Sequence, residues 1–127
     1  MPAIPFHILV EGNPVLIYAS RNGAPEKVMR TLCPFLDTFW QERELAEECT
    51  DTPEYLVAQL VVRYGFEFSE DDYSNLKVGI HFDPRAEYIY EVKDDRTVQI
   101  YKPTDRYQQN PSLGLEGCEV GDLWPRC

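Results

Sequence analysis

The feature of this sequence that most constrains its fold is a strict alternation of apolar and polar residues over 76–82. In an extended chain the apolar residues lie on one side and the others on the opposite side. The apolar set is Leu76, Val78, Ile80 and Phe82. After a turn at 83–85, residues 87–93 alternate again, and a second turn at 94–96 leads into 97–102. The pattern predicts a three-stranded antiparallel meander with one face exposed to water.

The residues before this meander predict a β-hairpin followed by two helices. Residues 6–10 and 15–20 are rich in β-branched and aromatic side chains, and the turn-forming stretch 11–14 separates them. A helix is expected from Pro25, with an apolar stripe that extends to Phe39 and a kink or break at Pro34. A second helix is expected to begin at Thr52 and Pro53 and to end at Gly65.

The predicted element order is therefore β-β-α-α-β-β-β. A chain of 127 residues fits one domain. We expect an α+β domain over 1–102, built on a single antiparallel sheet with both helices on one face. Periodicity disappears over 103–127, which predicts an irregular C-terminal tail packed on the domain.

The charge balance argues against two classes of partner. The chain has 22 acidic and 12 basic residues, a net charge of −10. Nucleic-acid and anionic-membrane binding both depend on Lys and Arg, so neither is expected. The N-terminal residues do not resemble a signal peptide, and no apolar run is long enough to span a bilayer. We therefore expect a cytoplasmic protein.

Four cysteines and two histidines are spaced without any close pair typical of a zinc site. In a reducing cytoplasm we expect free thiols. The alternative is a disulfide between Cys118 and Cys127. Glycine-rich phosphate-binding loops are absent too, so the sequence predicts no cofactor and no metal.

The candidate catalytic residues are Asp83, Glu91, Lys93 and His81. Asp83 followed by Glu91-Val92-Lys93 resembles the arrangement of metal-dependent nucleases, in which two carboxylates hold Mg²⁺ and a lysine helps to activate water. The reversed order Asp83-Pro84 and the acidic composition argue against it. His81 and Glu91 are expected to face water on adjacent strands, close enough for a general-base pair, although cross-strand charged pairs are far more often ordinary surface residues. The acidic stretch 67–72 lacks the pattern of a calcium-binding loop and is expected to be solvated.

Three functional hypotheses follow. The first is a non-enzymatic interaction or regulatory domain that binds a protein partner or a second copy of itself through the outer sheet face or the sheet edges, with Tyr101 and Tyr107 at the interface. The second is a small-ligand sensor with a pocket between helices and sheet. Its expected lining is Phe35, Phe39, Leu60, Tyr88 and Tyr90. The third is an uncharacterised metal-dependent enzyme that uses the candidate catalytic residues.

Overall fold

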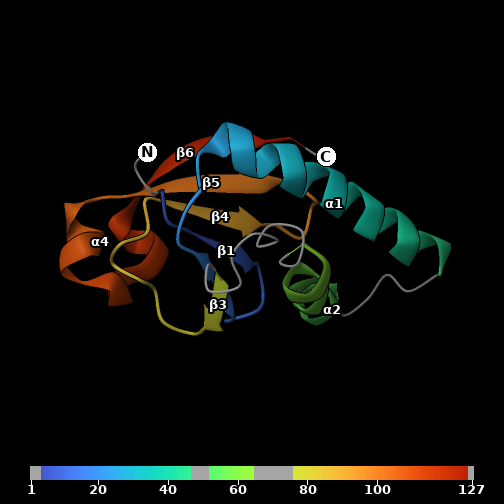
Figure 1. The fold of residues 1–127 in the computed structure, drawn as a ribbon, viewed down its shortest axis with the longest axis horizontal. Helices are drawn as coiled ribbons and strands as arrows, with labels where there is room; N and C mark the ends of the chain where they lie inside the picture. Colours follow the sequence, from blue (N-terminus) through green and yellow to red (C-terminus); the bar gives the residue numbers. More distant parts are fainter. Residues whose placement is uncertain (1–3, 47–51, 65–75, 126–127) are drawn as a thin grey trace.

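The computed structural model describes residues 4–46, 52–64 and 76–125 (Figure 1). The N-terminal half contains strands β1 (Phe6–Val10) and β2 (Leu16–Ala19), helices α1 (Pro25–Leu45) and α2 (Thr52–Gln59), and the π-helical turn η1 (Leu60–Tyr64). The C-terminal half contains strands β3 (Leu76–Gly79), β4 (Tyr88–Val92) and β5 (Val98–Pro103), helix α4 (Asp105–Gln109), the 3₁₀ segment η3 (Pro111–Gly117) and strand β6 (Cys118–Trp124).

All of these strands belong to one six-stranded sheet with the order β3-β2-β1-β4-β5-β6. The β1–β4 pair is parallel, and every other pair is antiparallel. The predicted α+β class with a single sheet is therefore confirmed. The sheet is mainly antiparallel, as expected, but it departs from a purely antiparallel one because β1, which lies between β2 and β4, runs alongside β4 in the same direction.

Both of the tight hairpins form as the sequence predicts. In the first hairpin Phe6 pairs with Ala19, and the connecting turn contains Gly12 at a φ of 90°, a conformation that glycine adopts without strain. In the second hairpin Tyr90 pairs with Ile100, and Arg96 in its turn has a φ of 70°. Local turn chemistry was enough to place these strands.

The predicted meander is wrong at its first strand. Strand β3 pairs with β2, with Leu76 opposite Ala19, and does not pair with β4. It ends at Gly79, and Val78 and Ile80 are 49% and 64% exposed. The reason is that β1 already occupies the position beside β4. Alternation determines which residues share a face, but it does not determine which strand lies alongside.

Helices α1 and α2 cover one face of the sheet, which we call the core face. Helix α1 runs without interruption through Pro34, so the predicted break is absent, and Pro34 faces solvent. The buried stripe that the sequence predicted is present, from Val28 to Phe39. The strand and helix residues of the core are Phe6, Ile8, Val10, Ile17, Ala19, Val28, Met29, Leu32, Phe35, Leu36, Phe39, Trp40, Leu56, Leu60, Tyr90, Val92, Val98 and Ile100.

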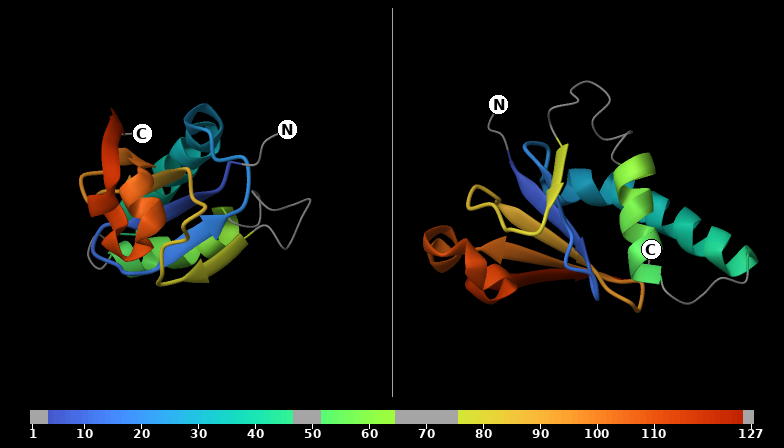
Figure 2. Two further views of the ribbon diagram at one scale, coloured as in Figure 1. Left: turned by 90° about the vertical axis from the view of Figure 1, so that its left-hand side faces the viewer. Right: turned by 90° about the horizontal axis from the view of Figure 1, so that it is seen from below.

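The C-terminal segment is ordered, contrary to the predicted irregular tail. It forms α4, η3 and β6, and β6 adds to the edge of the sheet beside β5. Helix α4 lies at the opposite end of the molecule from α2 (Figures 1 and 2). Tyr107 of α4 is fully buried against Phe82, and Phe82 in turn contacts His7 on the face opposite the core face. The helices are therefore not confined to one face.

The cysteine prediction is also corrected. Cys33 on α1 is disulfide-bonded, so it is not the free thiol that we expected. Cys118 is a free thiol, so it forms no clamp with Cys127. Within residues 4–46, 52–64 and 76–125, no helix has the length and apolar character needed to cross a membrane. Gly65 and the acidic stretch 67–72 lie outside the described residues.

Candidate functional site: the outer sheet face and its edges

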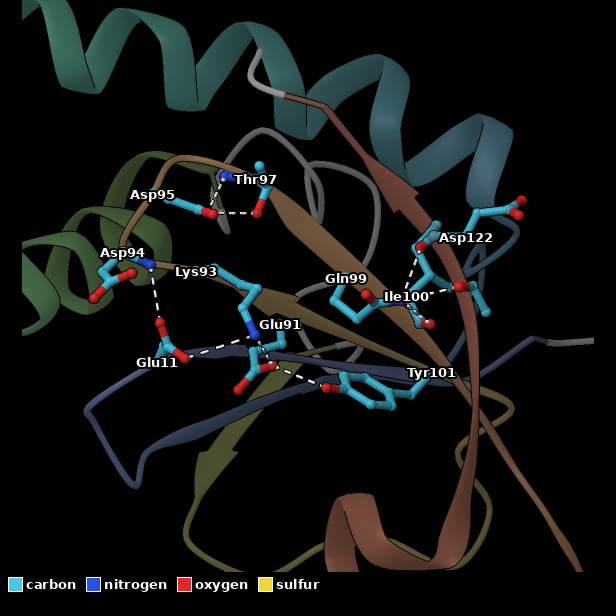
Figure 3. Close-up of polar contacts among 11 residues, drawn as sticks. Glu11, Glu91, Lys93, Asp94, Asp95, Thr97, Gln99, Ile100, Tyr101 and Asp122 are labelled. Carbon is cyan, nitrogen blue, oxygen red and sulfur yellow. Dashed lines mark hydrogen bonds and ion pairs between the residues drawn. The ribbon is translucent and has the colours of Figure 1, made fainter.

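The outer face is the side of the sheet that α1 and α2 leave uncovered. Four residues on this side, Glu11, Glu91, Lys93 and Tyr101, form a polar network (Figure 3). The Tyr101 hydroxyl donates a 3.1 Å hydrogen bond to Oε1 of Glu91. The Lys93 Nζ atom lies 3.6 Å from Oε1 of Glu91 and 3.6 Å from Oε2 of Glu11. The Glu91 carboxylate thus has a hydroxyl donor and an ammonium group as neighbours.

The electrostatics of this network favour a fixed protonation state. The nearby Glu91 carboxylate raises the pKa of Lys93, which keeps the ammonium group charged. Burial raises the pKa of Tyr101, and the negative charge of Glu91 acts in the same direction. Tyr101 therefore remains a hydrogen-bond donor at neutral pH, which suits a structural network better than proton transfer.

Asp83 belongs to a separate cluster in the loop between β3 and β4. The Arg85 guanidinium contacts both carboxylate oxygens, with Nε 3.0 Å from Oδ1 and the terminal nitrogen 2.8 Å from Oδ2. Lys77 Nζ donates to Oδ2 at 3.1 Å. The hydrogen bonds from Arg85 hold the pKa of Asp83 well below its usual range. The carboxylate is therefore a permanent anion with two cationic partners.

The nuclease-like set is thus divided between two clusters. The polar partners of Asp83 are Arg85 and Lys77, whereas Glu91 and Lys93 contact Tyr101 and Glu11. The His81 side chain is exposed in the bend that follows β3. Because β3 pairs with β2 and not with β4, His81 and Glu91 do not face each other across adjacent strands. Across the described part of the chain, no three His, Cys, Asp or Glu side chains gather closely enough to hold a metal ion.

His7 is the buried polar residue that sequence reasoning missed. It is only 1% exposed, and its Nε2 accepts a 2.9 Å hydrogen bond from the backbone N–H of Asp83. Burial lowers the pKa of His7 to about 4, against the opposing influence of the Ile17 backbone and the Asp83 carboxylate. The ring is therefore neutral at pH 7, and because Nε2 accepts a hydrogen bond its hydrogen is on Nδ1, where the Ile17 backbone is the hydrogen-bond neighbour. The only signal in the sequence was a histidine inside an otherwise apolar strand.

The five residues proposed for a ligand pocket belong to the core or pack against it. Phe35, Phe39, Leu60 and Tyr90 are buried in the core cluster, and Tyr88 packs against it. Tyr90 also donates a 2.5 Å hydrogen bond to the Gly23 carbonyl. Of the two interface candidates, Tyr101 is partly exposed on the outer face, while Tyr107 is fully buried and donates a 2.6 Å hydrogen bond to the Asp83 carbonyl.

Strand β6 forms one edge of the sheet and exposes a row of apolar side chains. Val120 is 70% exposed, Leu123 55% and Trp124 36%. Among the described strands only β5 pairs with β6, so no described strand pairs with the outer edge of β6. The strand is held at a bulge by Gln99, whose amide nitrogen donates to the carbonyls of Gly121 at 2.9 Å and Asp122 at 3.2 Å (Figure 3). Proteins that avoid pairing with other chains seldom leave an edge strand of this length with exposed apolar side chains.

Comparison with known proteins gives no match: no family model fits the chain, and neither a curated sequence nor a solved structure is significantly similar to it.

Proposed function

We propose that this chain is a non-enzymatic interaction domain that binds an extended, basic segment of a partner protein along strand β6. The observation that carries this proposal is the edge itself, seven residues long with all but its first residue exposed. Edge strands recruit partner segments through main-chain hydrogen bonds, and alternate side chains supply specificity. Val120 and Leu123 lie on the outer face, opposite Tyr101 and Gln99 of β5.

The charge of the chain supports a basic partner segment. Glu119 and Asp122 lie on β6 beside the exposed apolar residues, and both are exposed. The chain as a whole has a net charge of −10, which attracts a cationic partner and steers its approach. The same charge opposes pairing of β6 with a second copy, because two acidic edges would lie side by side.

The arrangement of the candidate catalytic residues also favours binding over catalysis. The Asp83 carboxylate already forms ion pairs with the Lys77 and Arg85 side chains. On the outer face the opposite charges of Glu91 and Lys93 neutralise each other. A general base needs an accessible group within reach of a substrate proton. A carboxylate that already accepts strong hydrogen bonds is a poor base, so these residues suit a fixed surface.

A peptide of alternating Val and Lys residues tests the proposal directly. Calorimetry should detect its binding, and the fluorescence of the partly exposed Trp124 should change in parallel. The same peptide with N-methyl groups on both edges of its backbone cannot form the strand ladder, and it should not bind. Replacing its Lys residues by Glu should weaken binding, and raising the salt concentration should weaken the Lys peptide.

A matched pair of variants locates the binding site. Val120→Lys places a charge on the β6 edge, whereas Val62→Lys places one at a similarly exposed valine on η1; the two side chains are 70% and 65% exposed. The first variant should lose peptide binding and the second should retain it. Equal binding of the N-methylated peptide, or full binding by Val120→Lys, would contradict the proposal. Sedimentation showing a dimer that Val120→Lys dissociates would assign the edge to a second copy instead.

A further inference from the structure

The two faces of strand β6 differ in chemistry, and the pairing of β6 with β5 identifies them. Residues that pair across adjacent strands have their side chains on the same face of the sheet. Leu123 pairs with Gln99 on the outer face, whereas Trp124 pairs with Val98, a buried residue of the core face. Because successive side chains of a strand alternate, Asp122 lies on the same face as Trp124. An acidic and an aromatic side chain are therefore neighbours on the core-face side of β6.

Both of these side chains are accessible. Trp124 is 36% exposed, and Asp122 is exposed as well. The backbone carbonyl of Asp122 accepts the Gln99 amide, but within residues 4–46, 52–64 and 76–125 its carboxylate has no ion-pair or hydrogen-bond partner. Glu119, the other acidic residue of β6, has the basic residue Lys102 as its cross-strand neighbour. Asp122 is therefore the carboxylate of this edge whose charge is available to a partner.

A segment that pairs with the open edge of β6 brings its own side chains next to both residues. In an antiparallel pair, residues directly opposite each other have Cβ atoms about 4.5–5.5 Å apart, and diagonal neighbours are about 7–8 Å apart. A long side chain opposite Asp122 or Trp124 can thus reach the carboxylate and the indole ring together.

The combination of a carboxylate and an indole ring favours arginine over lysine. A guanidinium group can donate two parallel hydrogen bonds to a carboxylate and can stack its flat face on an aromatic ring, whereas the lysine ammonium acts as a point charge. Tryptophan is the aromatic side chain that attracts cations most strongly. An arginine of the partner can therefore use both Asp122 and Trp124.

The chain itself contains one arginine in such surroundings. The guanidinium carbon of Arg96 lies 5.1 Å from the centre of the Trp40 ring, and the same guanidinium forms an ion pair with Glu44. Trp40 and Glu44 are four residues apart on α1, so they are neighbours on one side of that helix. The pair formed by Asp122 and Trp124 offers the same two groups on a strand, but without an arginine among the described residues.

We infer that one arginine of the partner segment binds to Asp122 and Trp124 on the core-face side of β6 and thereby sets the register of the segment. This inference rests on the proposed binding of an extended segment along β6, and it adds which side chain of that segment is recognised. On the outer face, Val120 and Leu123 contact the apolar side chains of the same segment.

A single change in the alternating Val–Lys peptide measures the preference. Replacement of one central Lys by Arg should tighten binding to the wild-type protein about fivefold, the size expected for one added contact of a cation with an exposed aromatic ring and a carboxylate. Citrulline has nearly the shape of arginine but carries no charge. A peptide with citrulline at that position should bind no more tightly than the all-Lys peptide, and calorimetry measures all three affinities.

Three variants of the protein locate the preference. Asp122→Asn removes the charge and keeps the shape of the side chain, so the Arg and all-Lys peptides should then bind with equal affinity. Trp124→Leu should also reduce the preference, because it removes the aromatic ring. Glu119→Gln is the matched control on the same face of β6, and it should keep the fivefold preference.

Failure of this inference can be distinguished from failure of the proposed function. If neither peptide binds the wild-type protein, the proposed function is wrong and this inference fails with it. Equal affinities of the two peptides for the wild-type protein, or a fivefold preference that persists in Asp122→Asn, would overturn this inference alone and leave strand pairing at β6 in place. Loss of the preference in Asp122→Asn and its retention in Glu119→Gln would support the arginine site.

Discussion

The backbone N–H of Asp83 donates a 2.9 Å hydrogen bond to Nε2 of His7, 76 residues earlier in the chain. This bond joins the loop after β3 to the centre of the sheet. The carbonyl of the same Asp83 accepts the Tyr107 hydroxyl at 2.6 Å, so the C-terminal helix α4 is tied to the same point. Three distant segments therefore depend on one neutral imidazole and on the backbone N–H and carbonyl groups of a single residue, Asp83.

We expect the stability of the protein to fall as the pH is lowered from 6.5 towards 4, because His7 must stay neutral in the folded state. Burial lowers its pKa from 6.5 to about 4, so in this range the unfolded chain binds more protons than the folded one. The loss should reach roughly 3 kcal/mol of unfolding free energy, from about 1.36 kcal/mol per pKa unit. Urea denaturation at a series of pH values measures it. His81→Gln should keep the same profile, and an NMR titration of His7 with a midpoint near 6.5 would contradict the prediction.

Tyr107→Phe should destabilise the protein by about 1–3 kcal/mol. The substitution preserves the buried ring and removes only the hydroxyl, which leaves the Asp83 carbonyl without this donor in a buried position. Tyr101→Phe serves as the control, because its hydroxyl lies on the partly exposed outer face and its loss should cost less. Unfolding midpoints in urea distinguish the two. Equal effects would show that the Tyr107 hydroxyl has no special role in holding α4.

Phe39→Ala should cost about 3–5 kcal/mol, because Phe39 is only 3% exposed and lies in the core between α1 and the sheet. Leu45→Ala, at the end of the same helix, should change stability very little, since Leu45 is 86% exposed. Thermal or chemical unfolding measures both. A midpoint for Phe39→Ala close to that of the wild type would mean that the stripe of α1 does not pack on the sheet.

Gly23→Ala should lower the stability of the protein, whereas Gly79→Ala should leave the stability almost unchanged. A Cβ at Gly23 would lie 2.4 Å from the Ile4 carbonyl oxygen and 2.7 Å from Cδ1 of Phe6, so the chain must shift, at a cost of about 1–3 kcal/mol. A Cβ at Gly79 meets no atom within 4 Å, so Gly79→Ala should be neutral or slightly stabilising. Circular dichroism melts of the two variants compare them directly. Equal stability of both variants would contradict the close approach at Gly23.

Local patterns in the sequence determined several elements of this protein. The hairpins β1–β2 and β4–β5 follow from β-branched runs separated by turn residues, and the buried stripe of α1 follows from helical spacing. The side of the sheet on which Tyr90 and Tyr101 lie also follows from alternation. These features depend on contacts within a few residues, and a sequence shows such contacts directly.

Only the tertiary structure decided which strands are neighbours and what the outer face contains. The parallel pairing of β1 with β4, the partner of β3 and the addition of β6 depend on which arrangement buries the most apolar surface over the whole chain. The same holds for the candidate sites. His7 and Asp83 are far apart in the sequence, and the outer-face positions of β1 and β4 looked like ordinary surface until α4 and the loop after β3 covered part of them. Alternation fixes the face of a residue, but its burial depends on which distant segment packs there.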